Sequence, residues 1–225
     1  MAKKYTYDTS KYKFKEILLN TFKVSNLETL HEHLEVPNLP KDVDGLGNDS
    51  HSKFHELFYS KLREDNSKFA YAYTQFVKNE IAPKFKLENN LIYQKLPSFR
   101  IQYPHSKAVT TWHFDNDGNH AHPLGELNIL IPLSDEMTGT NTVWAESLPG
   151  FGDFSPMNCK YGEYFLWNGN RCRHGNKPNS SGLTRVSMDF RVLPELWYDE
   201  NYSLTTATTS QKFVIGEYYS RVEVD

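Results

Sequence analysis

The first ninety residues carry apolar side chains at helical spacing. In three stretches an apolar residue recurs every three or four positions, which predicts helices over 14–22, 54–62 and 69–81. Pro83 is expected to end the last of them, because proline cannot continue a helix. This part of the chain is therefore predicted to be mainly helical.

A fourth, shorter helix is predicted between the first two. Ser25 followed by Glu28 matches a capping box, in which each side chain satisfies a backbone N–H at the start of a helix. The apolar face of this helix would carry Leu27, Leu30 and Leu34. The stretch 36–50 is rich in proline and glycine and is expected to form turns.

From about Leu91 onward the period of the apolar positions changes to two, as in half-buried strands. Strict alternation is clearest over 99–103 and 185–192. Further strand-like runs, bounded by glycine, proline, asparagine and aspartate, cover 108–115, 126–133, 140–146, 161–167 and 213–220. Many short strands separated by turn residues are typical of an antiparallel barrel or jelly roll.

The order of these elements predicts one α+β domain over residues 1–225, with helices packed on one face of a β-barrel. Residues 1–90 would form a mainly helical support and 91–195 the β core that carries the site. Residues 196–225 would be a C-terminal extension. We find no internal repeat and no low-complexity segment.

Composition narrows the class of protein. Hydrophobic residues make up 38% and charged residues 24% of the 225, which is typical of a globular chain. The longest near-continuous apolar run, 127–133, is too short to span a membrane. The net charge of −3 argues against a dedicated nucleic-acid binder, and the six lysines among the first 23 residues suggest a solvated face.

Two cysteines, Cys159 and Cys172, are too few for a disulfide framework or a cysteine-based zinc site. The first residues lack the apolar core of a secretion signal. The expected location is therefore the cytoplasm, with both thiols free. The sequence does not indicate an oligomeric state.

Candidate chemistry centres on His113 and Asp115. They lie two residues apart on a predicted strand, which would place both side chains on one face. His174 follows 59 residues after Asp115. Two imidazoles and one carboxylate form the facial triad that leaves open positions on iron(II). Asp117 is an alternative carboxylate, but it belongs to a predicted turn, so Asp115 is favoured.

Eleven residues beyond His174 stands Arg185, followed by Ser187 on the same strand face. A guanidinium can grip a carboxylate with two parallel hydrogen bonds, and a hydroxyl can add a third. The pair is therefore a candidate site for the far carboxylate of a dicarboxylic cosubstrate. Arg191, on the same face, is a weaker competitor because its spacing gives it no support.

A second metal-like pattern comprises His120, His122 and Glu126 and is similar to the first motif of cupins. A cupin would need its last histidine in a Pro-x-Gly-x-x-His setting. The residues before His174 read Asn170-Arg-Cys-Arg instead, so the cupin pattern is incomplete. The stretch 122–128 is expected to shape a pocket rim or hold a turn.

Taken together, these motifs resemble the iron(II)/2-oxoglutarate-dependent oxygenases of the phytanoyl-CoA-hydroxylase-like superfamily, and specifically the group named after a streptomycin-biosynthesis protein (the StrG-type group). The resemblance covers about 97–194. It is carried by His113-Phe-Asp115, His122-Pro-Leu-Gly-Glu126-Leu-Asn128, Asn141-Thr-Val-Trp144-Ala-Glu146, Asn168-Gly-Asn170-Arg171-Cys-Arg173-His174 and Thr184-Arg185-Val-Ser187.

The resemblance implies a double-stranded β-helix whose His113, Asp115 and His174 bind Fe(II). It implies that 2-oxoglutarate is the cosubstrate, with its distal carboxylate on Arg185 and Ser187. O2 would be the oxidant, and succinate and carbon dioxide would be released as the substrate is oxidised. Two further residues on predicted strands, Gln102 and Asn128, could also face the cosubstrate.

The substrate class is less clearly indicated. Polar residues near the expected mouth favour a small hydrophilic molecule, and the candidates to contact it are Trp144, Glu146, Arg171 and Arg173. Both arginines could equally pair with acidic residues at the surface. The alternative function is a non-catalytic jelly-roll or cupin-like module that binds a small molecule such as a sugar. Neither function involves nucleic acid or a membrane.

Overall fold

The computed structural model describes residues 2–33, 52–86, 89–106, 112–207 and 209–224. The helices in this part are α1 (Phe14–Phe22), α2 (Lys53–Leu62) and α3 (Lys68–Phe76), the π-helical turn η2 (Val77–Ile81), and the 3-10 turns η1 (Leu30–His33), η3 (Ala82–Lys84) and η4 (Glu195–Trp197). Ser52 and Ser67 cap α2 and α3, each accepting a hydrogen bond from the backbone N–H three residues on. The three main helices are thus confirmed.

The strands form a larger and two smaller antiparallel sheets. The larger sheet has the order β1 (Lys3–Thr6), β9 (Glu163–Trp167), β4 (Leu127–Pro132), β11 (Arg185–Pro194), β2 (Asn90–Gln94) and β12 (Tyr219–Glu223), with β3 (Ser98–Gln102) also paired to β11. The smaller sheets are β10 (His174–Asn176), β6 (Val143–Ala145) and β7 (Ser155–Pro156), and the pair β5 (Glu136–Met137) and β8 (Cys159–Lys160).

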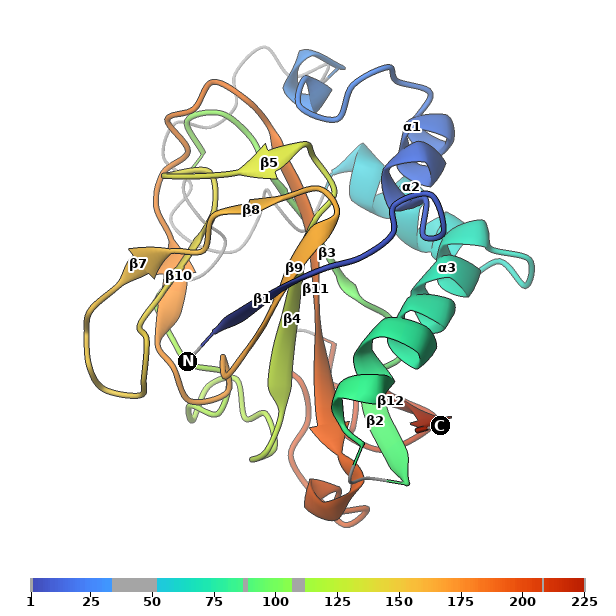
Figure 1. Cartoon of the computed structure of the whole chain (residues 1–225), viewed down its shortest axis with the longest axis vertical. Helices are drawn as coiled ribbons and strands as arrows, with labels where there is room; N and C mark the ends of the chain where they lie inside the picture. The colour runs from blue at the N-terminus through green and yellow to red at the C-terminus, as the bar shows by residue number, and fades with distance from the viewer. Residues whose placement is uncertain (1, 34–51, 87–88, 107–111, 208, 225) are drawn as a thin grey trace.

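The chain alternates between the larger sheet and the three-stranded smaller sheet. It runs from β3 in the larger sheet to a bridge at His113 in the smaller one, then through β4, β6, β9, β10 and β11 in alternation. Pairing β3, β11, β4 and β9 on one side and His113, β10, β6 and β7 on the other produces a double-stranded β-helix. The jelly roll and the α+β class predicted from the sequence are confirmed (Figure 1).

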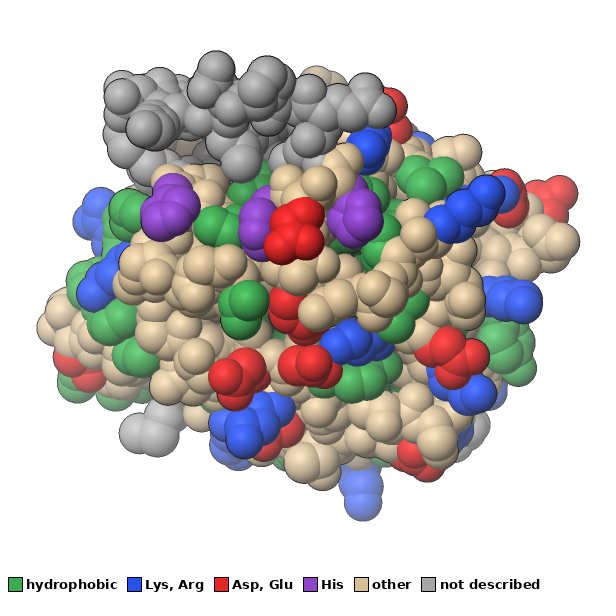
Figure 2. Space-filling view, turned by 90° about the horizontal axis from the view of Figure 1, so that it is seen from above, with side chains coloured by type: hydrophobic (Ala, Val, Ile, Leu, Met, Phe, Trp, Pro, Cys, Tyr) green, Lys and Arg blue, Asp and Glu red, His purple; other side chains and the backbone are tan. Residues whose placement is uncertain are grey.

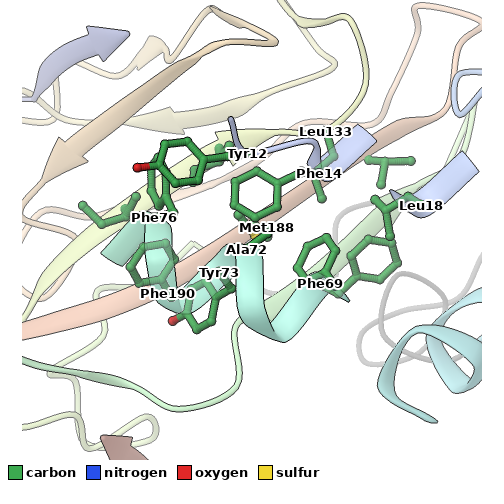
Figure 3. Close-up of a cluster of buried hydrophobic side chains, with 14 of the residues drawn as sticks. Tyr12, Phe14, Leu18, Phe69, Ala72, Tyr73, Phe76, Leu133, Met188 and Phe190 are labelled. Carbon is green, nitrogen blue, oxygen red and sulfur yellow. The ribbon is translucent and has the colours of Figure 1, made fainter. Parts of the chain in front are cut away.

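The outer face of the larger sheet packs on the helices. Val186, Met188, Phe190 and Val192 alternate along β11 and are fully buried in the main core. Figure 3 shows aromatic side chains of α1 and α3 packed over Met188 and Phe190. The rings of Tyr73 and Phe190 lie 5.0 Å apart, edge to face. Burial of these large side chains holds the helical layer to the sheet.

The inner face of the same sheet is polar where it meets the smaller sheet. The alternate residues of β11 are Arg185, Ser187, Asp189 and Arg191, and all four are mostly or fully buried. A second apolar cluster, with members from both sheets, closes the space between the sheets; it includes Leu130, Ala145, Trp167 and Cys172. A buried polar face of this kind requires partners for its charges, and these partners define the site.

The short helix predicted after Ser25 is wrong. Ser25 and Glu28 do not form a capping box, because the Glu28 N–H donates to Asn26 Oδ1 and the Glu28 carboxylate accepts from the distant Asp135 backbone N–H. Up to residue 33, where this described stretch ends, the one helical element after Glu28 is the 3-10 turn η1. Leu34 and the stretch 36–50 lie outside the described residues.

The predicted strand 108–115 is described only from residue 112, where His113 makes an isolated bridge and Asp115 begins a turn. The last strand begins at Tyr219 rather than at 213 and forms the edge of the larger sheet beside β2. β1, not foreseen in the lysine-rich start, pairs with β9 at the opposite edge. Within the described residues, no helix is long and apolar enough to cross a membrane.

Candidate metal centre

His113 and His174 are held together by the backbone. The two residues exchange both hydrogen bonds, His113 N to His174 O at 3.0 Å and His174 N to His113 O at 2.7 Å. Residues facing each other in an antiparallel pair point their side chains to the same side, and the two imidazole centroids lie 4.5 Å apart. The pairing of chain segments far apart in sequence therefore sets one side of the site.

Asp115 completes the cluster. Its Oδ1 lies 3.5 Å from His113 Nε2 and 3.6 Å from His174 Nε2. Among the described residues, His113, Asp115 and His174 are the single group of three metal-binding side chains that converges, with the ligand atoms all within 4.8 Å of one another. The three residues therefore meet as the sequence predicts, although Asp115 lies in a turn and not on a strand.

The other carboxylate oxygen of Asp115 is anchored. Oδ2 accepts hydrogen bonds from Asn128 Nδ2 at 2.7 Å and from Arg191 Nε at 3.0 Å, and it lies 2.9 Å from Arg191 Nη2 in an ion pair. Burial alone would raise the pKa of Asp115, but Arg191 and the nearby histidines outweigh it and hold the pKa well below its usual range. The carboxylate is thus ionised, and Oδ1 faces the two histidines.

Arg191 itself stands between two carboxylates. Its Nη1 lies 2.6 Å from Asp189 Oδ2, and Asp189 also accepts from Arg100 Nε at 3.0 Å. Burial would lower the pKa of Arg191, but Asp115 and Asp189 keep it well above its usual range. Arg191 therefore anchors the candidate metal ligand and is not available as the grip for a cosubstrate.

His174 is prepared as a ligand through its other ring nitrogen. Nδ1 donates a hydrogen bond to the Cys172 carbonyl at 3.0 Å, which leaves the lone pair on Nε2 facing Asp115. Burial lowers the pKa of His174 to about 4 against the opposing attraction of Asp115. A neutral imidazole with its orientation held in this way is the form that binds a metal.

Asp117, the alternative carboxylate, is occupied elsewhere. Its Oδ1 accepts from the backbone N–H groups of Asn119 and His120 at 2.9 Å and lies 2.7 Å from His120 Nδ1. The His120 ring stacks on His113 at 4.1 Å between centroids. The geometry therefore favours Asp115 over Asp117, and it places His120 against the outer side of a candidate ligand.

The cupin pattern does not assemble. His122 Nδ1 pairs with Glu126 Oε2 at 2.7 Å, and Glu126 accepts a further hydrogen bond from the Tyr219 hydroxyl. The His122 ring packs against Phe213 at 4.8 Å. These side chains thus contact each other and the C-terminal part of the chain, where they hold a turn, one of the two roles expected for the stretch 122–128.

Arg185 and Gln102 face each other across β11 and β3 and share the inner face with Ser187. Arg185, Ser187 and Gln102 are each at most 2% exposed. Gln102 Nε2 donates to the Lys177 carbonyl at 2.9 Å, while its Oε1 has no hydrogen-bond partner among the described residues. Asn128, also considered for the cosubstrate, donates its Nδ2 to the Asp115 carboxylate, and its contact with the cosubstrate stays a prediction.

Glu146 is buried but serves the backbone. Its Oε1 accepts from Arg173 N at 2.6 Å and its Oε2 from Gly152 N at 3.1 Å, while its own N–H donates to the Arg173 carbonyl. Both carboxylate oxygens are therefore engaged in fixing the loop after β6 and the residue that precedes His174. The contact of Glu146 with a substrate stays a prediction.

Replacing Glu146 with alanine is expected to lower the free energy of unfolding by about 2–3 kcal/mol, because two charge-assisted hydrogen bonds from the backbone N–H groups of Arg173 and Gly152 are lost. Urea unfolding of the metal-free protein measures the change. The matched control is Glu64→Ala, since Glu64 makes only an exposed ion pair with Lys61 and should cost at most about 0.5 kcal/mol. Equal costs for the two variants would contradict the anchoring role.

The structure also places the other three candidate substrate residues, one on β6 and two in the turn before His174. On β6, Ala145 faces His174 across the pairing with β10, so its neighbour Trp144 points to the opposite side of the smaller sheet, where Lys177 Nζ lies 3.3 Å from its ring. Arg173 is exposed and donates to the Trp112 carbonyl at 3.3 Å. Arg171 is exposed in the turn before His174. Their contact with a substrate stays a prediction.

The surface has no single sign of charge on the face shown in Figure 2. Lysine and arginine side chains are interspersed with aspartate and glutamate among the described residues, and histidine side chains gather around an acidic one.

Sequence reasoning considered Arg191 only as a weaker competitor for the cosubstrate carboxylate, and it connected neither Arg191 nor Asn128 with Asp115. One signal could have found Arg191: it follows Asp189 and Arg185 at even spacing on a strand whose other face is wholly apolar. Charged residues on a strand buried on both faces require opposite charges nearby. The pattern could not say that Asp115 is that partner.

A double-stranded β-helix in which two histidines and one carboxylate converge between the sheets has the ligand set of the non-haem iron(II) oxygenases. The donor atoms fit this metal, since they comprise two imidazole nitrogens and an ionised carboxylate oxygen.

Sequence comparison supports the resemblance to the StrG-type group. Over 129 residues, 57% of this chain, the sequence is 36% identical to the streptomycin biosynthesis protein StrG of Streptomyces griseus, so the chain is a homologue of StrG over this region. The match spans 59% of the length of StrG. No family model matches the chain.

Several solved structures are similar to this chain at low sequence identity. The non-heme alpha ketoglutarate dependent carbocyclase SnoK from nogalamycin biosynthesis is 12% identical, with 98% of this chain and 91% of that one covered and a TM-score of 0.49. CytC3 with Fe(II) and alpha-ketoglutarate is 15% identical, with coverages of 89% and 83% and a TM-score of 0.48.

AviO1 from Streptomyces viridochromogenes Tue57 is 16% identical, with 86% of this chain and 89% of that one covered and a TM-score of 0.46. At TM-scores below 0.5 these likenesses carry no weight for function, which must be inferred from the chain's own residues.

Proposed function

We propose that this chain is an iron(II)- and 2-oxoglutarate-dependent oxygenase that oxidises a small polar molecule. The observation that carries the proposal is the convergence of His113, Asp115 and His174, with the carboxylate fixed from behind by Arg191 and Asn128. An anchored carboxylate beside two imidazoles is a preformed metal site, because its ligands need little reorganisation to bind.

His113, Asp115 and His174 would hold the metal through Nε2, Oδ1 and Nε2. Bound there, iron(II) would supply the activation of O2 that couples decarboxylation of 2-oxoglutarate to oxidation of the substrate. The chain's own residues orient the ligands and shield the site. Arg191 and Asn128 keep the carboxylate turned toward the histidines, and Trp167, whose ring lies 4.8 Å from that of His174, covers one side of the site.

Arg185 would bind the distal carboxylate of 2-oxoglutarate, with Ser187 donating a further hydrogen bond. Both lie on β11, on the inner face that also carries the Asp115 anchor Arg191. A buried guanidinium on a rigid strand is well placed to hold a carboxylate with two parallel hydrogen bonds. Gln102, directly across from Arg185 on β3, would face the same cosubstrate.

A binding experiment tests the function directly. Protein purified without oxygen is mixed with Fe(II) and then with 2-oxoglutarate, and the weak visible charge-transfer band of the chelate is recorded. We expect the band to require both additions, and we expect succinate release on exposure to air. Intact protein that binds a small molecule but shows neither band nor succinate would favour the non-catalytic jelly-roll module.

The substrate is proposed to be small and polar because the turn that follows Asp115 is polar, with Asn116, Asp117, Asn119 and His120 in succession around Gly118. A screen for succinate release across amino acids, sugars and their phosphates would identify the class. Mass spectrometry of the product should show an added oxygen atom. If only apolar compounds stimulated succinate release, the proposal of a polar substrate would be contradicted.

Replacing Arg185 with leucine is expected to raise the 2-oxoglutarate concentration needed for half-saturation by about 30- to 150-fold, which corresponds to about 2–3 kcal/mol for a lost charge-assisted contact. The band at saturating Fe(II), titrated with 2-oxoglutarate, measures the change. Arg185→Lys keeps the charge but loses the paired hydrogen bonds, so it should lie between wild type and Arg185→Leu. An unchanged titration curve for Arg185→Leu would remove Arg185 from this role.

A further inference from the structure

The C-terminal segment, residues 196–207 and 209–224, contacts the turn that carries the candidate carboxylate ligand. That turn, the Asp115 loop (residues 115–126), lies between Asp115 and the start of β4. The longest chain of contacts begins on β12, where the Tyr219 hydroxyl donates to Glu126 Oε1. Glu126 Oε2 accepts from His122 Nδ1 at 2.7 Å. Glu126 and Tyr219 are at most 1% exposed, so this polar chain is shielded from water.

His122 passes the contact on to Asp115 through its backbone. The His122 N–H donates to the Asp115 carbonyl at 3.0 Å, and the His122 carbonyl accepts from Asn116 Nδ2 at 2.6 Å. On its other side Asp115 donates its own N–H to the Gly169 carbonyl at 3.0 Å. The backbone of Asp115 is therefore held between the turn before His174 and the peptide of His122.

Two further contacts come from the same segment. The Tyr202 hydroxyl donates to the carbonyl of Ala121 at 2.8 Å, and Ala121 has a positive φ of 55°. A non-glycine residue in this conformation is strained and persists where its surroundings hold it. Trp197 packs over Gly125, where a Cβ would lie 2.5 Å from the indole, so the close approach requires glycine.

We propose that the C-terminal segment positions the Asp115 carboxylate, acting through Tyr219, Glu126 and His122 as positioning residues. The inference depends on the proposed function only in taking Asp115 as a metal ligand. A carboxylate held at its side chain by Arg191 and Asn128 still needs a fixed backbone if Oδ1 is to stay within reach of both histidines. Partners beyond the ligands commonly change metal affinity when removed.

The test uses the full chain and the variant Tyr219→Phe, which removes only the hydroxyl that reaches Glu126. The matched control is Tyr198→Phe. Tyr198 lies in the same segment and packs on the Tyr219 ring at 6.3 Å, but its hydroxyl accepts from the Ile215 N–H and has no described contact with the Asp115 loop. If removing a hydroxyl merely loosened the segment, both variants would change. If the Tyr219 contact with Glu126 positions the loop, only Tyr219→Phe should change.

The first readout needs no metal. Amide hydrogen exchange of the metal-free protein should show the peptide covering 115–126 exchanging about 5- to 10-fold faster in Tyr219→Phe, because local opening becomes easier. Tyr198→Phe should match wild type in that peptide. Unchanged exchange in Tyr219→Phe, or equal acceleration in the control, would overturn the proposal.

The second readout is the dissociation constant of Co(II), an oxygen-stable probe whose visible absorption reports the geometry of its site. Tyr219→Phe should weaken Co(II) binding by about 3- to 10-fold and Glu126→Leu by about 10- to 100-fold. Glu126→Gln can still accept from Tyr219 and bond to His122, so it should stay within about threefold of wild type. A Glu126→Leu protein that remains folded and binds Co(II) like wild type would overturn the proposal.

The two readouts separate this inference from the proposed function. If wild-type protein binds no Co(II), the metal centre itself fails, and the exchange experiment still decides whether the segment holds the Asp115 loop. If wild type binds Co(II) and the variants do not differ from it in either readout, the metal centre stands and the positioning role fails.

Discussion

Replacing His174 with alanine is expected to weaken Fe(II) binding by more than about 100-fold and to abolish turnover with it. His174 supplies one of three ligand atoms, and its loss removes more than the 10- to 100-fold that a supporting residue usually costs. It is also the ligand whose free nitrogen is set by a hydrogen bond from Nδ1 to the Cys172 carbonyl. Anaerobic titration with Fe(II), followed by the charge-transfer band with 2-oxoglutarate, measures the effect.

The control for this variant is His33→Ala. His33 is exposed at the end of η1 and lies outside the converging group, so its removal should leave Fe(II) affinity unchanged. Because His174 is buried, unfolding of both variants should be compared at the assay temperature. A folded His174→Ala protein with wild-type affinity and turnover would show that another residue is the third ligand.

Replacing Arg191 with methionine is expected to lower the free energy of unfolding by about 3–5 kcal/mol. The change leaves the buried carboxylates of Asp115 and Asp189 without the cation between them, and an uncompensated buried charge is strongly destabilising. Asp189 keeps Arg100, so the largest part of the loss arises at Asp115. Urea unfolding of the metal-free protein measures the change.

Arg221→Met provides the comparison. Arg221 forms an ion pair of 3.4 Å with Glu195, and its side chain is 47% exposed, so its loss should cost at most about 0.5 kcal/mol. If Arg191→Met cost as little, the charges on the inner face would not be coupled as the distances indicate. The Arg191→Met protein should also bind Fe(II) more weakly, since Asp115 Oδ2 would keep only Asn128.

The ligand set could be read from the sequence because it depends on residue type and spacing. His113 and Asp115 are two residues apart, and His174 precedes the Arg185 and Ser187 pair by a spacing that chance rarely produces. The expectation that His113 and Asp115 share one face of a strand was incomplete, however. They meet because His113 bridges to His174 and the chain turns at Asp115, not because both lie on a regular strand.

Partners across the fold could not be read in the same way. Glu28 looked like a capping residue, yet its carboxylate is taken by the backbone of Asp135 and by Lys15. Glu146 was singled out only as a candidate to contact the substrate, and nothing in the sequence indicated that its carboxylate accepts from the backbone N–H groups of Arg173 and Gly152. A local sequence pattern indicates which hydrogen bonds a side chain can form with its neighbours in the chain. In the folded protein, a group from a distant segment can take that side chain as its partner instead.

The sequence by itself determined the helical layer, the alternating strands and the three candidate ligands, because apolar periodicity and ligand chemistry are local properties. The tertiary structure alone decided that Arg191 and Asn128 anchor Asp115, since strand register places side chains from β4 and β11 behind one carboxylate oxygen. It also decided that the C-terminal segment lies against the Asp115 loop. Such contacts join residues dozens of positions apart, and no spacing within one strand encodes which charges will share a buried face.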